Sequence, residues 1–208
     1  HYNNYQFFLE CYESLKKQTI TNFEIVIVDD CSTDDSFEKI KLITKDDSRV
    51  KIYQNEKNNG VGYTKKKCVN LANGDICGFL DPDDALLPDA IESLLKIYEN
   101  SQIVAAYSEF YLCDEHLNIQ KKFPNSRKIK NNNPYFFNIH FEIAHFFTFR
   151  KDVYLKTESI IADYKIVEDI DFYLKLYEIG NFKFIKKLFN KEKEVNINSD
   201  FSESMMQR

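Results

Sequence analysis

The chain has 208 residues, of which 43% are hydrophobic and 29% are charged, and its formal net charge is −5. This composition is typical of a soluble globular protein large enough for one α/β domain, and the negative charge argues against a nucleic-acid-binding surface. No apolar run approaches the ~20 residues that a membrane span requires. The five cysteines form no C-x-x-C pair, which predicts reduced thiols in a cytosolic protein and neither a disulfide framework nor a zinc site.

The first predicted element is a helix within residues 1–19. It is indicated by Phe8, Leu9, Tyr12 and Leu15, which recur at helical spacing. A strand usually precedes such a helix in an α/β chain, so we expect the opening strand of the fold to be missing from this chain.

Strands and helices then alternate up to residue 100. The strands are predicted at 23–30, 50–55 and 75–81, and the helices at 32–47, within 58–74 and at 86–100. Alternation of this kind favours parallel pairing through helical crossovers. The sequence therefore predicts a single α/β domain with a mostly parallel central sheet flanked by helices.

In the second half of the chain, strands and helices alternate less regularly. Strand is predicted over 103–114, strand then helix over 141–157, and helix over 168–181. Residues 124–134 form a polar loop that has almost nothing apolar to bury, so we expect it to be mobile. Residues 191–208 read as a polar C-terminal tail.

Two of the early strands end in acids. Asp29 and Asp30 close the first, and Asp81, Asp83 and Asp84 follow the third. Ligands of open α/β sheets bind beyond the carboxyl ends of the strands, where both groups are expected to lie. Either group alone is equally compatible with solvated loop acids or helix N-caps. Together they favour a divalent cation, Mn²⁺ or Mg²⁺, because both metals prefer oxygen ligands.

The motifs of the chain, taken in order, resemble a known family. They are YNN, FEIVIVDDCSTDDS, NNGVGYTKK, FLDPDD and VEDIDFYLKL, and they run from residue 2 to about residue 180. This set resembles the family 2 glycosyltransferases of the GT-A fold. The resemblance implies transfer of a sugar, with inversion, from a nucleotide-diphosphate sugar, with UDP as the first choice, to a glycan or lipid-linked acceptor in polysaccharide biosynthesis. It also implies a nucleotide-binding half (1–100) and an acceptor-binding half (101–190).

The resemblance assigns roles to the acids of FLDPDD. Asp83 is implied as the direct ligand of Mn²⁺ or Mg²⁺, and Asp81 as a second metal ligand, through water, or a contact to the ribose. Asp84 is implied to face the donor sugar or to orient the loop. For Asp84 the alternative is an N-cap of the following helix.

Other positions are implied to bind the nucleotide. Asp30 resembles the acid that holds the nucleobase, with Tyr2 stacking on the base, whereas Asp29 is expected to be structural. Gly60 matches the glycine loop that lets the backbone approach the donor. Lys65 is expected either to reach a phosphate or to lie on a solvated helix face.

The resemblance places the catalytic base at Glu168-Asp169. We prefer Asp169, with Glu168 second, because an inverting displacement needs a carboxylate opposite the leaving group. Acids at the start of a helix also occur for dipole reasons alone. His145 is flanked by aromatic residues, so we expect a core histidine more than an acceptor contact.

Two rival functions remain open at this point: a phospho-acceptor receiver domain, and an inactive module that binds nucleotide sugars. A receiver domain carries similar acids around Mg²⁺ but has no place for residues 100–180. For the enzyme, we expect a cytoplasmic location, with peripheral contact at the inner membrane face left open.

Overall fold

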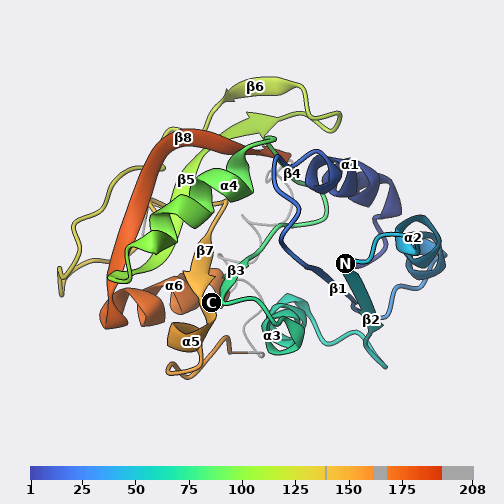
Figure 1. Cartoon of the computed structure of the whole chain (residues 1–208), viewed down its shortest axis with the longest axis horizontal. Helices are drawn as coiled ribbons and strands as arrows, with labels where there is room; N and C mark the ends of the chain where they lie inside the picture. The colour runs from blue at the N-terminus through green and yellow to red at the C-terminus, as the bar shows by residue number, and fades with distance from the viewer. Residues whose placement is uncertain (139, 162–167, 194–208) are drawn as a thin grey trace, which may run out of the picture.

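The computed structural model describes residues 1–138, 140–161 and 168–193, except the side chain of Glu168 (Figure 1). Its first elements are α1 (Tyr5–Lys16), β1 (Ile25–Asp29), α2 (Ser36–Thr44), β2 (Val50–Gln54) and α3 (Val61–Leu71). They are followed by β3 (Ile76–Gly78), β4 (Ala85–Leu86), α4 (Ala90–Leu95), the 3₁₀ turn η1 (Lys96–Glu99), β5 (Ile103–Cys113) and β6 (Ile119–Lys122). The last are β7 (Thr148–Arg150), α5 (Lys151–Tyr154), α6 (Glu168–Ile179) and β8 (Asn181–Lys193).

The strands form two sheets. β1 and β2 are a parallel pair, and a six-stranded sheet has the order β3-β7-β5-β8-β4 with β6 paired to β5. The α/β class is confirmed, but the pairing is more mixed than expected. Only β1–β2 and β5–β8 are parallel, whereas β3–β7, β4–β8, β5–β6 and β5–β7 are antiparallel. Both parallel pairs have a helix in the connection between their strands, as a parallel crossover requires.

Helix α1 joins the two sheets. The hydroxyl of Ser14 accepts a hydrogen bond from the amide of Leu86 in β4 at 3.0 Å, and the Gln18 side chain donates to the Leu87 carbonyl at 2.9 Å. Figure 1 shows β4 between α1 and the end of β8. The acidic residues before β4 therefore stand where the first helix, the short strand and the last strand meet.

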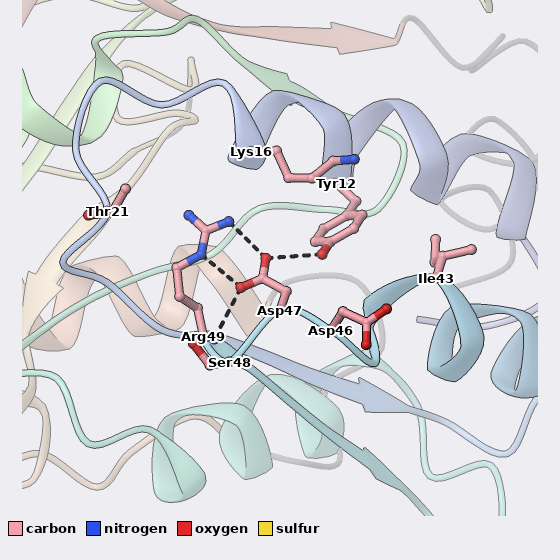
Figure 2. Close-up of a pocket in the computed structure, with 8 residues that line it drawn as sticks. All are labelled: Tyr12, Lys16, Thr21, Ile43, Asp46, Asp47, Ser48 and Arg49. Atoms are coloured by element: carbon pink, nitrogen blue, oxygen red, sulfur yellow. Dashed lines mark hydrogen bonds and ion pairs between the residues drawn. The ribbon is translucent and has the colours of Figure 1, made fainter.

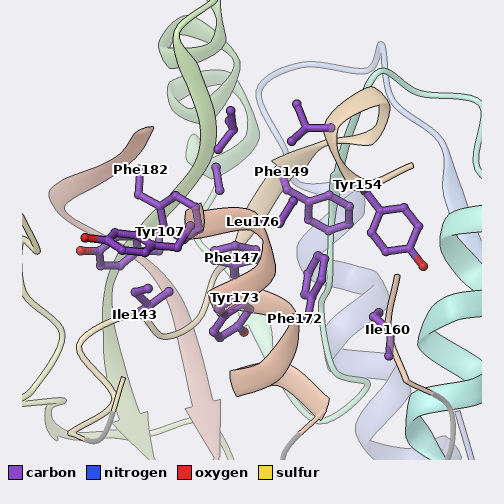
Figure 3. Packing of buried hydrophobic residues seen from close by; sticks show 14 of the residues in the cluster. Tyr107, Ile143, Phe147, Phe149, Tyr154, Ile160, Phe172, Tyr173, Leu176 and Phe182 are labelled. Carbon is purple, nitrogen blue, oxygen red and sulfur yellow. The ribbon is translucent and has the colours of Figure 1, made fainter. Parts of the chain in front are cut away.

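An aromatic core fixes α6 against the larger sheet (Figure 3). Phe172 is 0% exposed and its ring lies 4.8 Å from that of Phe149 and 5.8 Å from that of Phe147. Full burial of each such side chain stabilises the fold by about 1.5–3 kcal/mol. This packing sets the position of the first turn of α6, which carries the acidic pair.

The polar loop at 124–134 buries one apolar side chain, and the mobility expected of it stays a prediction. Ile129 is 9% exposed and belongs to the same core as Phe172. The hydroxyl of Tyr107 donates to the Arg127 carbonyl at 2.7 Å and accepts from the Ile129 amide at 3.1 Å. One apolar residue among polar ones gives no periodic signal, so only the tertiary fold reveals this contact.

The last strand extends beyond the expected tail boundary. Residues 191–193 belong to β8, which pairs with both β5 and β4, while 194–208 lie outside the described residues. The strand was not predicted because its lysines break the hydrophobic alternation, and pairing on two sides supplies what local propensity does not. No helix in the described part of the chain is long and apolar enough to cross a bilayer.

Candidate functional site

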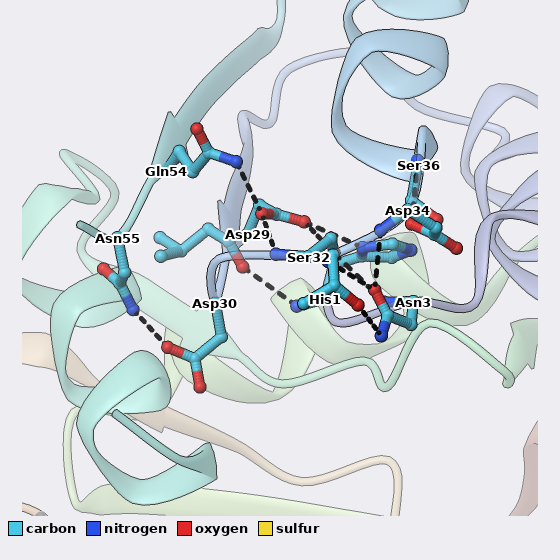
Figure 4. A network of polar contacts seen from close by, with 11 residues as sticks. His1, Asn3, Asp29, Asp30, Ser32, Asp34, Ser36, Gln54 and Asn55 are labelled. Carbon is cyan, nitrogen blue, oxygen red and sulfur yellow. Dashed lines mark hydrogen bonds and ion pairs between the residues drawn. The ribbon is translucent and has the colours of Figure 1, made fainter. Parts of the chain in front are cut away.

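Asp29, at the end of β1, is fully engaged by neighbouring donors (Figure 4). It is 0% exposed and accepts hydrogen bonds from the Ser32 amide at 2.8 Å, the Ser32 hydroxyl and the Gln54 side chain at 3.1 Å. A His1 ring nitrogen lies 3.2 Å away. These contacts agree with the structural role expected for Asp29.

Asp30 organises the loop that precedes α3. Its carboxylate accepts from the Asn55 side chain at 2.7 Å, the Asn59 amide at 2.9 Å and the Gly60 amide at 2.8 Å. Gly60 has φ of +86°, a conformation that glycine adopts without the strain of a side chain. Two of these bonds reach Oδ1 and one reaches Oδ2, so Oδ2 accepts a single hydrogen bond among the described residues.

Tyr2 is 43% exposed, so its ring is open to a stacking partner. The nucleobase contacts expected of Tyr2 and Asp30 stay predictions.

Helix α3 links the two acidic regions through neighbouring residues. Thr64 accepts a hydrogen bond from the Asn55 side chain at 3.2 Å, which ties it to Asp30. Lys65 is 8% exposed, and its ammonium lies 2.9 Å from Asp169 Oδ1 and over the Phe79 ring. A solvated helix face is therefore wrong for Lys65, and its contact with a phosphate stays a prediction.

The acids between β3 and β4 are crowded. Burial favours the neutral form of Asp81, but the positive charges of Lys65 and His145 outweigh it and lower its pKa. Burial and the charge of Asp81 raise the pKa of Asp83. Asp84 is 3% exposed, and burial together with the charge of Glu192 raises its pKa well above the usual value. The three carboxylates thus differ in protonation tendency although they are adjacent in sequence.

Asp84 does not cap a helix. The chain passes from Asp84 into β4, and α4 begins only at Ala90, with Asp89 at its N-cap. The N-cap alternative raised by the sequence is therefore wrong. The implied role of Asp84 beside the donor sugar is left as a prediction.

Glu192 was missed by the sequence reasoning because it was placed in a polar tail. It stands on β8, and the charges of Asp81, Asp83 and Asp169 raise its pKa together with burial. Its Oε2 atom is buried and has no hydrogen-bond partner among the described residues. No local motif marks this position, since only the pairing of β8 with β4 brings it to the acids.

His145 lies close to these acids. It is half-buried, and its charge lowers the pKa of Asp81 while opposing the rise for Asp83 and Glu192. The expectation of a core histidine was therefore incomplete, because the ring stands at the border between the core and the acidic region.

The candidate base stands at the start of α6. The Asp169 side chain is 29% exposed and is paired with Lys65, so one part of its carboxylate faces outward. The Glu168 side chain lies outside the described residues, and the preference between the two acids is not tested. Asp171 pairs with Lys175 at 2.7 Å on the same helix.

The carboxylates are not arranged around a common metal position. Within residues 1–138, 140–161 and 168–193, no group of three or more His, Cys, Asp or Glu side chains is placed to hold a metal ion. The chemistry of the donors nevertheless fits Mn²⁺ or Mg²⁺: all the acids offer oxygen, and Glu192 contributes a buried oxygen without a partner.

A groove lined by acidic and basic side chains lies at the other end of the β1–β2 pair (Figure 2). Asp47 there accepts hydrogen bonds from the Tyr12 hydroxyl at 3.0 Å and from the Arg49 guanidinium at 2.9 and 2.8 Å. Arg49 also caps the start of β1, because its carbonyl accepts from the Ile25 amide. Both oxygens of Asp47 are therefore engaged within the protein.

Comparison with known proteins gives matches that agree with one another. The model of the family described as "Glycosyl transferase family 2" matches residues 1–157. An uncharacterized glycosyltransferase of Methanocaldococcus jannaschii is 33% identical over 171 residues, covering 80% of this chain and 58% of that protein. The chondroitin synthase of Escherichia coli is 32% identical over 194 residues, covering 90% of this chain and 27% of that protein. The chain thus spans little more than half of the first relative and about a quarter of the second.

Solved structures share the fold. S. aureus TarS 1-349, in complex with UDP-GlcNAc, superposes with a TM-score of 0.74 at 20% identity, covering 94% of this chain and 57% of that one. A mannosyltransferase from Pyrobaculum calidifontis, in complex with GDP-Man and Mn²⁺, gives a TM-score of 0.70 at 12% identity, covering 95% and 56%. The expected GT-A fold is confirmed by these likenesses.

Proposed function

Because the chain belongs to glycosyl transferase family 2, we propose that it transfers a sugar, with inversion, from a UDP-linked sugar to a glycan acceptor. The observation that carries this proposal is the bridge made by α3. Its residue Thr64 reaches the Asp30 loop, and its next residue, Lys65, reaches Asp169 and the neighbourhood of Asp81. One helix thereby ties together a nucleotide-side acid, a metal-side acid and a base.

The FLDPDD acids serve the leaving group in this proposal. Asp83 and Asp81 would hold Mn²⁺ or Mg²⁺. When bound, the cation stabilises the negative charge that grows on the diphosphate as the bond to the anomeric carbon breaks. At ~4 Å and an effective dielectric near 20, a pair of unit charges is worth on the order of 4 kcal/mol before desolvation. A contribution of that size matters for a diphosphate leaving group.

Asp169 serves the acceptor. Inversion requires attack from the face opposite the leaving group, so the group that removes the proton from the acceptor hydroxyl must stand apart from the cation. Asp169 comes from α6, in the acceptor half (101–190), and its exposed oxygen is free to take that proton. Lys65 fixes the other side of the carboxylate, with its ammonium 2.9 Å from Oδ1.

The donor nucleotide occupies the half formed by residues 1–100. Tyr2 stacks on the base, Oδ2 of Asp30 accepts from a base N–H, and the Gly60 loop lies along the donor. Glycan and UDP are supported by the names of similar proteins: a chondroitin synthase and a structure that holds UDP-GlcNAc. Mn²⁺ is supported by the mannosyltransferase of the same fold. A lipid-linked acceptor is the alternative to a free glycan.

A thermal-shift panel tests the donor and the metal together. UDP, UDP-sugars and GDP-mannose are each added with Mn²⁺, with Mg²⁺ or with excess chelator. We expect UDP compounds to raise the melting temperature only when a metal is present. Equal stabilisation in chelator would remove the metal from the proposal, and a preference for GDP-mannose would change the donor.

Matched variants locate the metal in the same panel. Asp83→Asn should abolish the metal-dependent part of the UDP shift, because it removes the charge of the proposed ligand. Asp75→Asn, an exposed acid just before the opposite end of β3, should leave the shift intact. An unchanged shift in Asp83→Asn would place the cation elsewhere.

A further inference from the structure

Positive charge gathers in one stretch of this acidic chain. The whole chain has a formal net charge of −5, yet residues 116–141 contain no Asp or Glu. The basic residues of this stretch are Lys121, Lys122, Arg127, Lys128 and Lys130. Lys122 and Arg127 form ion pairs, whereas Lys128 and Lys130 are exposed. A local excess of cations in an acidic protein favours a partner with negative charge.

Large aromatic side chains are exposed in the same stretch. Tyr135 is 84% exposed, Phe137 61% and Phe141 48%. Phe136, between the first two, instead packs on Tyr177 with the ring centroids 4.8 Å apart. The loop is thus held in place by one ring, while the neighbouring rings stay outside the core. Exposed apolar side chains that occur singly are ordinary, but a group of them marks an interaction site.

Hydrogen bonds bring the basic and the aromatic residues together. The Tyr177 hydroxyl donates to the Lys130 carbonyl and accepts from the Asn133 amide at 3.0 Å. The Arg127 guanidinium lies 2.9 Å from the carboxylate of Glu142. These contacts hold the basic residues beside the aromatic ones. Figure 1 shows this segment outside β8, on the side away from the β1–β2 pair.

The chemistry of this surface suits an anionic lipid bilayer. We define the basic–aromatic surface as Lys128, Lys130, Tyr135, Phe137 and Phe141. Aromatic side chains settle at the headgroup level of a membrane, and each Lys close to anionic lipid adds to the attraction. The two Phe rings carry no hydrogen-bonding group, so they gain most from leaving water for an apolar layer.

An acceptor at the proposed base would not cover this segment. Tyr177, on which the segment is anchored, lies about two turns of α6 beyond Asp169, or ~12 Å along the helix axis. The exposed rings beside Tyr177 therefore stand at the opposite end of the helix from the proposed base, and the proposed reaction does not use them.

We propose that the basic–aromatic surface docks the protein on an anionic bilayer. The rings enter the headgroup layer, and the two lysines contact lipid phosphates. Docking of this kind needs neither donor nor metal, so it goes beyond the proposed transfer of sugar and stands or falls separately from it.

Co-sedimentation of the full chain with vesicles tests the proposal. Vesicles of phosphatidylcholine alone are compared with vesicles that also contain phosphatidylglycerol, and we expect binding only to the second, anionic kind. Lys128→Gln/Lys130→Gln should weaken this binding by roughly 10–30-fold, because each Lys beside anionic lipid contributes a factor of about five. Phe137→Ser should weaken it as well. Neither variant should change the melting temperature, since the altered side chains are exposed.

Matched variants carry the same changes elsewhere on the surface. Lys17→Gln/Lys45→Gln removes two exposed positive charges at the ends of α1 and α2. Leu42→Ser removes an apolar side chain of α2 that is 64% exposed. Both controls should bind anionic vesicles like the wild type. Because the two double variants have the same net charge, a difference between them reports the place of the contact and not the total charge.

A fluorescent reporter shows whether the rings enter the bilayer. The chain contains no Trp, so Phe137→Trp and Leu42→Trp each introduce a single emitter. With anionic vesicles, the emission of Phe137→Trp should shift to shorter wavelength, because the ring moves from water into a less polar layer. Leu42→Trp should not shift. Dextran sulfate, a soluble acidic polymer, should leave both emissions unshifted.

Each contrary outcome overturns the proposal. No binding to anionic vesicles, equal binding to both kinds of vesicle, or equal losses in the two double variants would exclude a defined docking surface. Wild-type binding in Lys128→Gln/Lys130→Gln or in Phe137→Ser would place the contact elsewhere. Tight binding of dextran sulfate, with no vesicle-dependent shift in Phe137→Trp, would assign the surface to an acidic polymer. None of these outcomes changes the proposed function, which the thermal-shift panel tests.

Discussion

The two acidic groups at the strand ends look alike in sequence but differ in their partners. Asp29 and Asp30, after β1, accept hydrogen bonds from amides and side chains that surround them. Asp84, just before β4, has its pKa raised by burial and by the charge of Glu192. The first group is hydrogen-bonded within the protein, and the second lies among other carboxylates.

This difference shows that burial alone does not identify a functional acid. Asp29 is 0% exposed and Asp84 is 3% exposed, yet only Asp84 lies among other carboxylates. A buried carboxylate with donors on all sides stabilises the fold, because removing it leaves those donors unpaired. A buried carboxylate that is ionised among like charges opposes folding instead.

The largest expected effect concerns Asp169, the proposed base at the start of α6. Asp169→Asn keeps the shape of the side chain and removes its proton affinity, so donor binding should stay near wild type while turnover falls by ~10²–10⁴, the usual contribution of a positioned general base. Turnover is measured with the UDP-sugar that stabilises the protein most. Glu168→Gln should reduce turnover less.

Asp171→Asn, two residues further along α6, is the control for that experiment and should keep near-normal turnover. If Asp169→Asn stayed active and Glu168→Gln did not, the other acid of the pair would be the base. Activity in both variants would remove the base from α6.

A smaller effect, on the free energy of unfolding, tests the difference between the two acidic groups. Asp29→Asn should lower the free energy of unfolding by about 2 kcal/mol, because an amide cannot accept from all the donors around it. Asp84→Asn should leave the metal-free stability unchanged or raise it, because it removes a buried like charge. Urea unfolding in chelator measures both. If Asp84→Asn lowered the free energy of unfolding as much as Asp29→Asn, the two acidic groups would not differ in the way described.

The smallest effect is a pH dependence at the far groove. The hydrogen bonds and charge of Arg49 outweigh burial and lower the pKa of Asp47. A lowered folded pKa means that the stabilisation is present above the unfolded value of about 3.9 and is lost as the pH falls through the folded value. Wild type should exceed Asp47→Asn in stability by about 1 kcal/mol at pH 7, and by less at pH 3.

Tyr12→Phe is the control at this groove. Burial, aided by Asp47, raises the pKa of Tyr12 to about 12, so the hydroxyl stays neutral from pH 3 to pH 7. Removing the hydroxyl should lower the free energy of unfolding by a similar amount at pH 3 and at pH 7. A difference between wild type and Asp47→Asn that did not shrink at low pH would show that Asp47 is not held ionised by Arg49.

Local pattern predicted most elements of the first half of the chain, but it placed one helix over 86–100, where the structure has the end of β4, then α4 and η1. The helical spacing of Phe8 and Tyr12 predicted α1, because the buried face of a helix follows its period. The β-branched run before Asp29 predicted β1, which is buried along nearly all of its length. The acids of the candidate site were found in the same way, since a strand end carries its own signal in the polar residues that follow it.

Tertiary pairing decided the rest. The sequence by itself determined the α/β class, the early elements and the acids Asp30, Asp81, Asp83 and Asp84. Only the structure decided that β8 extends to Lys193, that the charge of Glu192 acts on Asp84, and that Lys65 reaches Asp169 across the two halves. These contacts join residues that are more than a hundred positions apart, and no local period records which distant strand will supply a partner.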